Sequence, residues 1–239
     1  MKYKKDDEFS YCLGATLAVE AINSSDAKVE CVYYNAKTSE ELTLKFSKLC
    51  SAKNIKFELN NKIFNALSDK ENCYIIAKFK KFEKQIKSGY PHIVLVNPSN
   101  MGNLGTIIRS SLGFNVKDIA IIKPAVDLFD PKTIRASMGA LFNARVQYFD
   151  SIEEYMQKFK NYKCYPFMLK AKSDLRNVKD IDLSHTALIF GNEATGLDDK
   201  FLNIGESVII KHSNSIDSLN LQTAVSIALF HFTKEINDF

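Results

Sequence analysis

The stretch "NPSNMGNLGTIIRSSLGFN", residues 97–115, decides how the second part of the chain folds. It follows the apolar run "HIVLVN", and its own apolar residues recur at helical spacing behind a glycine-containing turn. This pattern predicts a buried strand that leads into an amphipathic helix. Arg109 lies on the helix, one turn after Gly105. Because a helix N-terminus favours anions, Arg109 and the nearby Asn103 predict a site for a phosphate or a ribose oxygen. The alternative is a surface arginine that merely interrupts the apolar stripe.

Strands and helices continue to alternate after this stretch. Buried apolar strands separated by helices indicate a mainly parallel sheet that is covered on both faces. We expect strands at 92–97, 118–123, 164–169, 187–191 and 207–211, with further helices at 151–159 and 219–236.

The front part of the chain reads as a small α/β domain. All five prolines lie beyond residue 90 and seven of the nine glycines lie beyond residue 100, so we place a linker at 85–90 and domains at 1–86 and 87–239. Helices are expected at 15–23, 39–52 and 62–67, and strands at 29–35, 55–59 and 74–82.

The positive charge is concentrated in the front part. Residues 1–88 contain 16 lysines, no arginine and 12 acidic residues, which gives the whole net charge of +4. The densest patch is "KFKKFEK", residues 78–84, which suits docking to a polyanion, although a solvated lysine-rich face is the alternative. Aromatic residues interleaved with these lysines could stack on bases, although aromatic residues of a strand are more often half core and half surface: Tyr74, Phe79 and Phe82.

Composition excludes several classes of protein. With 46% hydrophobic and 25% charged residues, the chain is expected to be globular. No apolar run reaches the roughly 20 residues of a membrane helix, and residues 1–10, "MKYKKDDEFS", contain no apolar segment of the kind a secretory signal needs, so none is expected. Five scattered cysteines without CxxC spacing predict free thiols in a cytoplasmic protein, and no zinc site.

Two further strand ends carry unusual polar residues. "ALIFG" runs into "GNEATGL", which presents Glu193, and "SVIIK" runs into "HSNSIDSLN", which presents Ser218 and Asn220. Ligands of open α/β sheets bind at the carboxyl ends of strands, so we expect these residues in one site. Each is also explained by helix capping. A GxGxxG fingerprint is missing, which disfavours a nucleotide-dependent dehydrogenase.

Together these segments resemble the SpoU (TrmH-like) branch of the SPOUT RNA methyltransferases over nearly the whole chain. The family's N-x-G-x-x-x-R, G-x-E-x-x-G-L and S-L-N motifs match "NLGTIIR", "GNEATGL" and "SLN" in order. "DPKTIRASMGALF" looks like the family's K-x-x-R-x-S-x-G-A-x-F segment. The front part is similar to the ribosomal-protein-like substrate-binding domain that precedes many SpoU enzymes.

The resemblance implies a knotted (trefoil) catalytic domain that binds S-adenosylmethionine and methylates a ribose 2′-hydroxyl of RNA as a homodimer, without a metal. It implies catalytic residues Asn103, Arg109, Glu193, Ser218 and Asn220. It implies cofactor-binding residues Leu188, Gly191, Asn192, Ile210, His212 and Leu219. With the charge pattern, it suggests RNA-binding residues Lys78, Lys80, Lys81, Lys132 and Arg135.

The chain departs from the family pattern at two places. The family's I-P-M reads Ile210, Lys211 and His212, which makes this wall of the expected pocket more polar, and the glycine after the first-motif helix is Asn115. Ribosomal RNA is favoured over transfer RNA because a front domain accompanies many rRNA members. The alternatives are a tRNA 2′-O-methyltransferase, a base methyltransferase, and an RNA-binding member of the fold without catalysis.

Overall fold

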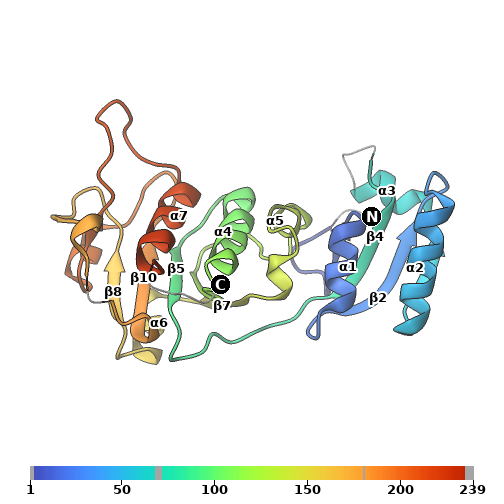
Figure 1. The fold of residues 1–239 in the computed structure, drawn as a ribbon, viewed down its shortest axis with the longest axis horizontal. Coiled ribbons are helices and arrows are strands. Elements are labelled where there is room, and N and C mark those ends of the chain that lie inside the picture. Colours follow the sequence, from blue (N-terminus) through green and yellow to red (C-terminus); the bar gives the residue numbers. More distant parts are fainter. Residues whose placement is uncertain (1–2, 68–71, 180, 235–239) are drawn as a thin grey trace. The chain divides into compact units, whose positions relative to one another are not determined.

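The computed structural model describes residues 3–67, 72–179 and 181–234, which form two compact units (Figure 1). The front unit ends at Phe82 and also contains Asp127–Asn143. The second unit contains Glu83–Val126 and the chain from Ala144 onward. The predicted domains follow chain order, whereas the structure groups Asp127–Asn143, which lies late in the sequence, with the front unit.

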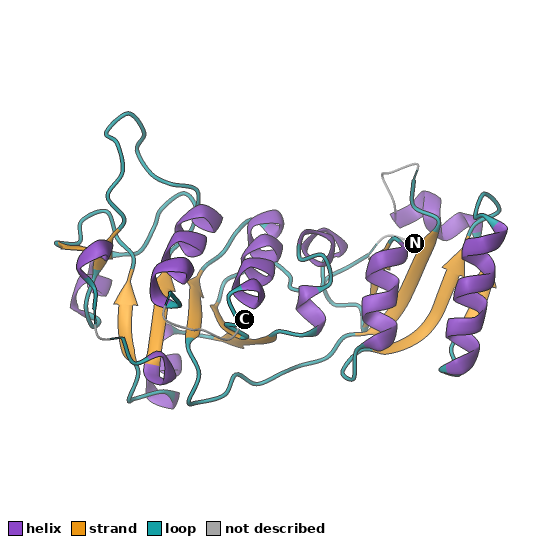
Figure 2. Ribbon diagram, viewed as in Figure 1, coloured by secondary structure: helices purple, strands orange, loops and turns teal. Residues whose placement is uncertain are grey.

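The front unit is built on a four-stranded sheet in the order β1-β4-β2-β3 (Figure 2). β4 is antiparallel to β1 and to β2, and β2 is parallel to β3. The predicted helices and strands of this part are confirmed, but β1 was not expected, because its partner β4 lies more than sixty residues away in the sequence. The elements are β1 (Phe9–Leu13), α1 (Ala15–Asn23), β2 (Lys28–Tyr34), α2 (Glu40–Ala52), β3 (Lys56–Leu59), α3 (Asn61–Leu67), β4 (Ile75–Lys80), α5 (Pro131–Ala136) and the 3-10 helix η1 (Ala140–Phe142).

The second unit contains a five-stranded, entirely parallel sheet in the order β7-β6-β5-β10-β8. A separate two-stranded parallel pair joins β11 to β9. The expected parallel sheet is therefore confirmed. β7 was not predicted, because it is an edge strand whose mixed sequence "RVQYF" is not an apolar run. The elements are β5 (His92–Val96), α4 (Met101–Gly113), β6 (Asp118–Ile122), β7 (Arg145–Phe149), α6 (Ile152–Lys158), β8 (Lys163–Pro166), β9 (Ser173–Asp174), η2 (Leu175–Asn177), η3 (Leu183–His185), β10 (Thr186–Phe190), η4 (Asp199–Asn203), β11 (Val208–Ile209) and α7 (Leu221–Phe232).

Both faces of this sheet are buried. Val94, Ala120 and Ile189 pack in one cluster with Tyr155 of α6. Successive residues of a strand point to opposite faces, so the alternate strand residues lie on the other face, where they are also fully covered. α4 and α7 lie side by side in Figure 1, and the Ser226 hydroxyl of α7 donates to the Ser110 hydroxyl of α4 at 3.3 Å.

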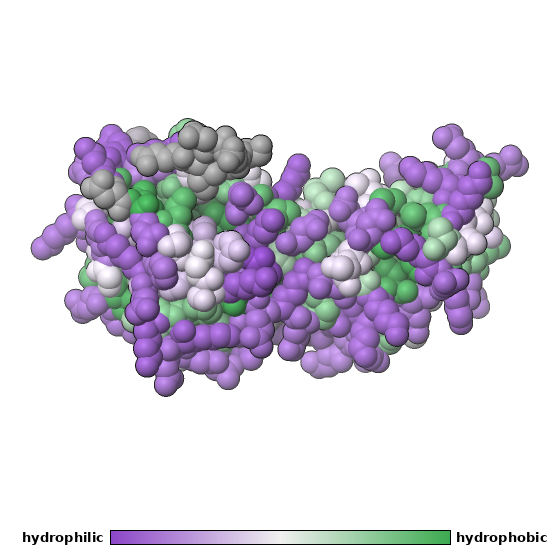
Figure 3. Space-filling model, turned by 60° about the horizontal axis from the view of Figure 1, so that its bottom comes forward, coloured by the Kyte–Doolittle hydropathy of each residue, from purple (hydrophilic) through white to green (hydrophobic). Residues whose placement is uncertain are grey.

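The final helix begins later than predicted. Asn220 precedes it and caps it, so Leu221 is its first residue, and it ends at Phe232, before the predicted end at 236, which lies outside the described residues. Among the described helices, none is long and apolar enough to cross a membrane. Hydrophilic side chains dominate the face drawn in Figure 3. The trefoil knot stays a prediction.

Candidate active site

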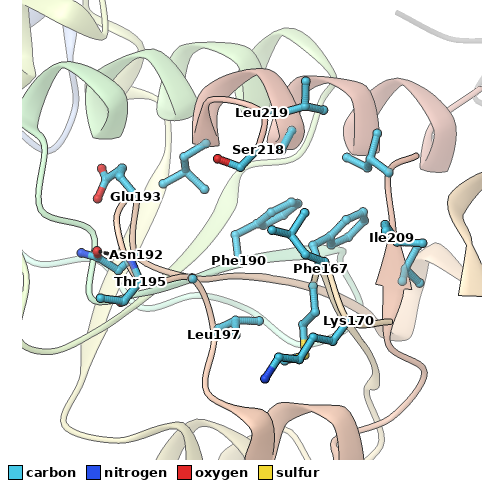
Figure 4. Close-up of a pocket in the computed structure, with 18 of the residues that line it drawn as sticks. Phe167, Lys170, Phe190, Asn192, Glu193, Thr195, Leu197, Ile209, Ser218 and Leu219 are labelled. Carbon is cyan, nitrogen blue, oxygen red and sulfur yellow. Dashed lines mark hydrogen bonds between the residues drawn. The ribbon is translucent and has the colours of Figure 1, made fainter. Parts of the chain in front are cut away.

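A pocket of about 630 Å³ opens at the carboxyl ends of β8 and β10. In Figure 4, Phe167 and Phe190 lie in the middle, with the turn after β10 on one side, Ile209 on the other, and Ser218 and Leu219 toward α7. A volume of this size suits a nucleoside-sized ligand. The pocket is lined by Phe167, Met168, Leu169, Lys170, Phe190, Gly191, Asn192, Glu193, Ala194, Thr195, Gly196, Leu197, Asp198, Asp199, Val208, Ile209, Ile210, His212, Ser218, Leu219, Leu221 and Ala224.

The turn after β10 is held in shape by its glycines. The Gly196 N–H donates to the Asn192 carbonyl at 2.9 Å, and the Asn192 N–H donates back to the Gly196 carbonyl at 3.3 Å. A Cβ on Gly191 would lie 2.2 Å from the Gly196 carbonyl carbon, far inside van der Waals contact. Gly196 has a φ of 69°, which disfavours other residues. The turn therefore requires glycine at 191 for lack of space and favours glycine at 196 because of its φ.

Glu193 joins this turn to the start of α4. Its carboxylate accepts hydrogen bonds from the Ser99 N–H at 3.0 Å, the Ser99 hydroxyl at 2.7 Å, the Asn100 N–H at 3.2 Å and the Asn103 Nδ2 at 3.1 Å. Partial burial alone would raise the pKa of Glu193, but the donors of Ser99 and Asn103 outweigh it and lower the pKa. The carboxylate is a fixed anion that ties two of the predicted motifs together.

A second set of bonds aligns the same two segments. Asn192 Nδ2 donates to the Asn97 carbonyl at 2.8 Å, where Asn97 has a φ of 52° at the end of β5. The Asn100 side chain caps α4 by accepting from the Asn103 N–H at 3.0 Å. Asn103 thus contacts both the helix cap and Glu193.

The other predicted catalytic residues lie at the surface. Arg109 is exposed on α4, and its side chain makes no hydrogen bond or ion pair with any residue in the described ranges. Ser218 is exposed and lines the pocket. Asn220 is exposed and caps α7, accepting from the Gln222 N–H at 2.9 Å. Neither Arg109 nor Asn220 lines the pocket itself.

Five of the six predicted cofactor residues line the pocket: Gly191, Asn192, Ile210, His212 and Leu219. Leu188 does not, because it is buried within β10. The His212 Nδ1 lies 2.9 Å from the Ile210 carbonyl, so it carries the proton of this bond, since a carbonyl can only accept.

Sequence reasoning missed the aromatic floor of the pocket. Phe167 and Phe190 are stacked with ring centroids 4.4 Å apart. Both lie in stretches that were read only as strands, and a phenylalanine at the end of a buried strand does not differ from a core residue in sequence. The floor, the backbone of the glycine turn and the apolar Ile210 and Leu219 fit an adenosine group. Among the described residues, no group of histidine, cysteine and acidic side chains could hold a metal ion.

The predicted RNA-binding lysines of β4 are paired within the front unit. Lys78 forms an ion pair with Glu30 and lies over the Phe9 ring at 4.0 Å. Lys80 pairs with Glu8 at 2.7 Å. Lys81 donates to the Lys5 carbonyl at 2.7 Å. The charges of Lys78 and Lys80 are thus balanced by carboxylates of the same unit.

Two other predictions for RNA contacts have different outcomes. Phe79 is fully buried and packs edge-to-face on Phe142 with centroids 5.4 Å apart, so the prediction that it stacks on bases is wrong. Lys132 and Arg135, in contrast, are exposed one turn apart on α5. Their side chains have no hydrogen-bond or ion-pair partner in the part of the chain that the structure describes.

The comparison with known families agrees with the motifs. Residues 90–230 match the SpoU rRNA Methylase family. The 23S rRNA (uridine(2479)-2′-O)-methyltransferase of Streptomyces viridochromogenes is 26% identical over 156 residues, which cover 63% of this chain and 54% of the relative. The match therefore spans about half the length of that curated relative.

Solved structures share the fold. The AdoMet-bound rRNA methyltransferase from Sinorhizobium meliloti superposes with a TM-score of 0.82 at 22% identity, covering 97% of this chain and 89% of that chain. A second solved structure, from work on the 2-OH methylation of C/U34 on tRNA, superposes with a TM-score of 0.57 at 22% identity. The match covers 62% of this chain and 97% of that chain. At these identities the similarity shows the fold.

Proposed function

The chain belongs to the SpoU rRNA methylase family, and from this we propose that it is an S-adenosylmethionine-dependent RNA methyltransferase that methylates a ribose 2′-hydroxyl. One observation carries the proposal: Glu193 binds Ser99, Asn100 and Asn103, so the turn that lines the pocket is fixed against the helix that bears Arg109. The pocket and the arginine thereby belong to one site at the carboxyl ends of the strands.

The pocket residues fit the cofactor. Phe167 and Phe190 would lie against its adenosine, and the backbone of the turn at Gly191 would hydrogen-bond it. Bound S-adenosylmethionine supplies a methyl group on a sulfonium, which needs no metal to make the thioether a good leaving group. Burial of the ligand among Ile210 and Leu219 would keep water away from that carbon.

Arg109 would hold the RNA. A guanidinium is effectively always protonated, so it donates hydrogen bonds rather than accepting the proton of the 2′-hydroxyl. Donation to the ribose oxygen or to the adjacent phosphate would fix the oxygen in line with the methyl group. The Asn220 Oδ1 accepts from the Gln222 N–H, which leaves its Nδ2 group and the Ser218 hydroxyl for contacts to the ribose.

Several finer features form part of the same proposal. We favour ribosomal RNA as the substrate, supported by the rRNA methyltransferase among the relatives. A homodimer is supported by exposed apolar side chains on α7, where Phe230 is 68% and Ile227 37% exposed. A trefoil knot is expected from the family. Five buried free cysteines support a reducing, cytoplasmic setting.

Transfer RNA is the second candidate substrate. This reading is supported by the tRNA-related structure, whose chain is matched over 97% of its length. A silent RNA-binding protein is the third reading, and it rests on Lys211 and His212 in place of the family's Pro and Met.

The proposal is tested by mass spectrometry of rRNA and tRNA nucleosides from cells with and without this gene. We expect one 2′-O-methylated nucleoside to be lost, and to return with the wild-type gene but not with Arg109→Ala or Arg109→Lys. Isothermal calorimetry of the purified chain with S-adenosylmethionine runs beside it. An unchanged nucleoside profile together with absent cofactor binding would refute the enzymatic function.

A further inference from the structure

The second unit carries two exposed cations that share one buried carboxylate. Asp174 of β9 accepts from the Arg176 Nε at 3.1 Å and the Arg176 Nη2 at 2.5 Å, and the Lys211 Nζ lies 3.5 Å from the same carboxylate. The pairing of β9 with β11 sets Asp174 opposite Ile209, which brings Lys211 to it. Two positive charges therefore face a single negative one, and the cluster has a net charge of +1.

The excess positive charge of this cluster is accessible to a ligand because the two cations are exposed and the carboxylate is not. The Asp174 side chain is 6% exposed, whereas Arg176 is 74% and Lys211 59% exposed. In the Lys80–Glu8 pair of the front unit, the two side chains are 53% and 59% exposed, so the positive and the negative charge are equally accessible to a polyanion. At Asp174 an incoming polyanion meets the cations and not the carboxylate.

The buried carboxylate also fixes the direction of the arginine. Asp174 accepts from the Arg176 backbone N–H at 3.0 Å as well as from its guanidinium, which locks the side chain at the start of η2. The Nη1 group of Arg176 bonds to none of the described residues, so its two N–H donors are free for a ligand. A guanidinium held in place loses little entropy when it binds a phosphate.

We propose that Arg176 and Lys211 form a binding site for the RNA phosphate backbone beside the cofactor pocket. This inference rests on the proposed RNA methyltransferase function and adds a contact that no family motif contains. Lys211 does not line the pocket itself, but its chain neighbours Ile210 and His212 do, so the proposed phosphate site lies next to the pocket wall. The site anchors the backbone of the RNA whose ribose is presented to Arg109.

The test is the salt dependence of RNA binding by the full chain. Fluorescence anisotropy with a fluorescein-labelled 20-nucleotide poly(U) RNA gives Kd over a range of KCl concentrations. Each lost phosphate contact on a single strand lowers the slope of log Kd against log [KCl] by about 0.7. We expect this decrease for Arg176→Ala and for Lys211→Gln, and about 1.4 for the double variant. Arg176→Lys keeps the charge and should keep the slope.

Lys163→Ala is the matched control. It removes the same charge from the same unit, but Lys163 pairs with the half-buried Glu206 at 2.9 Å and lies at the amino end of β8. Its slope should equal that of the wild type. If Arg176→Ala and Lys211→Gln also keep the wild-type slope, or if Lys163→Ala lowers the slope as much as they do, the phosphate site is refuted. The proposed methyltransferase function is not affected by that result. A wild-type chain that binds no RNA and methylates none would instead refute the proposed function and the site with it.

Discussion

The polar side chains at the two edges of the β7-β6-β5-β10-β8 sheet differ in burial: those at the amino edge are buried and bonded within the chain, and those at the carboxyl edge are exposed. At the amino edge, His92, Asp118 and Arg145 lie at the starts of adjacent strands, and the first two are fully buried and bonded. At the carboxyl edge, Ser218 is exposed and lines a pocket, and Arg109 is exposed on α4, the helix that follows β5. A polar group whose bonds are all made within the chain stabilises the fold, and one left in solvent beside a pocket is available to a ligand.

The bonds of the amino edge are short and complete. The His92 Nε2 lies 2.8 Å from the Lys87 carbonyl and must donate to it, so Nδ1 accepts from the Tyr155 hydroxyl at 2.8 Å. Arg145 Nε donates to Asp118 at 2.7 Å, and the Lys87 N–H donates to the same carboxylate at 2.9 Å. The segment around Lys87, expected to be a linker, is thereby bound to the second unit.

The largest effect on stability is expected at the amino edge. Arg145→Met leaves Asp118, which is 0% exposed, as a buried charge without its ion-pair partner. Breaking a buried pair from one side costs about 3–5 kcal/mol of the free energy of unfolding. Urea denaturation of the purified chain measures the loss. Lys163→Met removes a charge from the more exposed Lys163–Glu206 pair and should cost less than about 1 kcal/mol. Equal losses in the two variants would mean that burial of the carboxylate does not decide the cost of breaking the ion pair.

The next effect concerns the one crowded position of the carboxyl edge. Gly191→Ala places a Cβ 2.2 Å from backbone atoms of Gly196, so the turn must open. We expect a loss of about 1–3 kcal/mol in stability, together with loss of S-adenosylmethionine binding in calorimetry. Gly113→Ala is the control, because a Cβ there meets nothing within 4 Å in α4. It should be neutral or stabilise by up to about 1 kcal/mol. Cofactor binding by Gly191→Ala at wild-type affinity would contradict the pocket assignment.

A smaller effect follows from the protonation of His92. Burial lowers the pKa of His92, against the opposing effect of the Lys87 carbonyl bond. The unfolded chain therefore takes up a proton near pH 6.5 while the folded chain does not, so stability is complete above this pH and falls below it. The fall is at most about 1.4 kcal/mol per pH unit. Unfolding midpoints between pH 5.5 and 7.5 should show this slope in the wild type and lose it in His92→Gln. The same slope in both proteins would mean that His92 is not responsible.

The two edges were not equally predictable from the sequence. Glycine and asparagine in tight turns leave local signals, so the turn at Gly191 and the cap at Asn220 fall within motifs that can be read along the chain. The Asp118–Arg145 pair forms between residues 27 positions apart, and neither residue differs locally from a surface charge. The phenylalanine floor and the fully buried Phe79 were missed for the same reason, since side-chain direction depends on partners distant in the sequence.

The smallest effect on stability, and the largest on activity, is expected at Arg109. The side chain is exposed and bonds to none of the described residues, so Arg109→Ala should change the free energy of unfolding by less than about 0.5 kcal/mol. Loss of a donor to the reacting ribose should lower kcat at least about 100-fold. Asn220→Ala is the informative comparison, because it also removes the α7 cap and should cost about 1 kcal/mol of stability.

These two variants separate the functions that a polar side chain can have at one edge. If Arg109→Ala unfolds as readily as Asn220→Ala, then Arg109 stabilises α4 and its exposure is no sign of ligand binding. If it keeps wild-type stability and cofactor affinity but loses methylation, then the arginine acts only on the RNA. The exposed cation would then be a group whose partner is supplied by the substrate, in contrast to Arg145, whose partner Asp118 is supplied by the neighbouring strand.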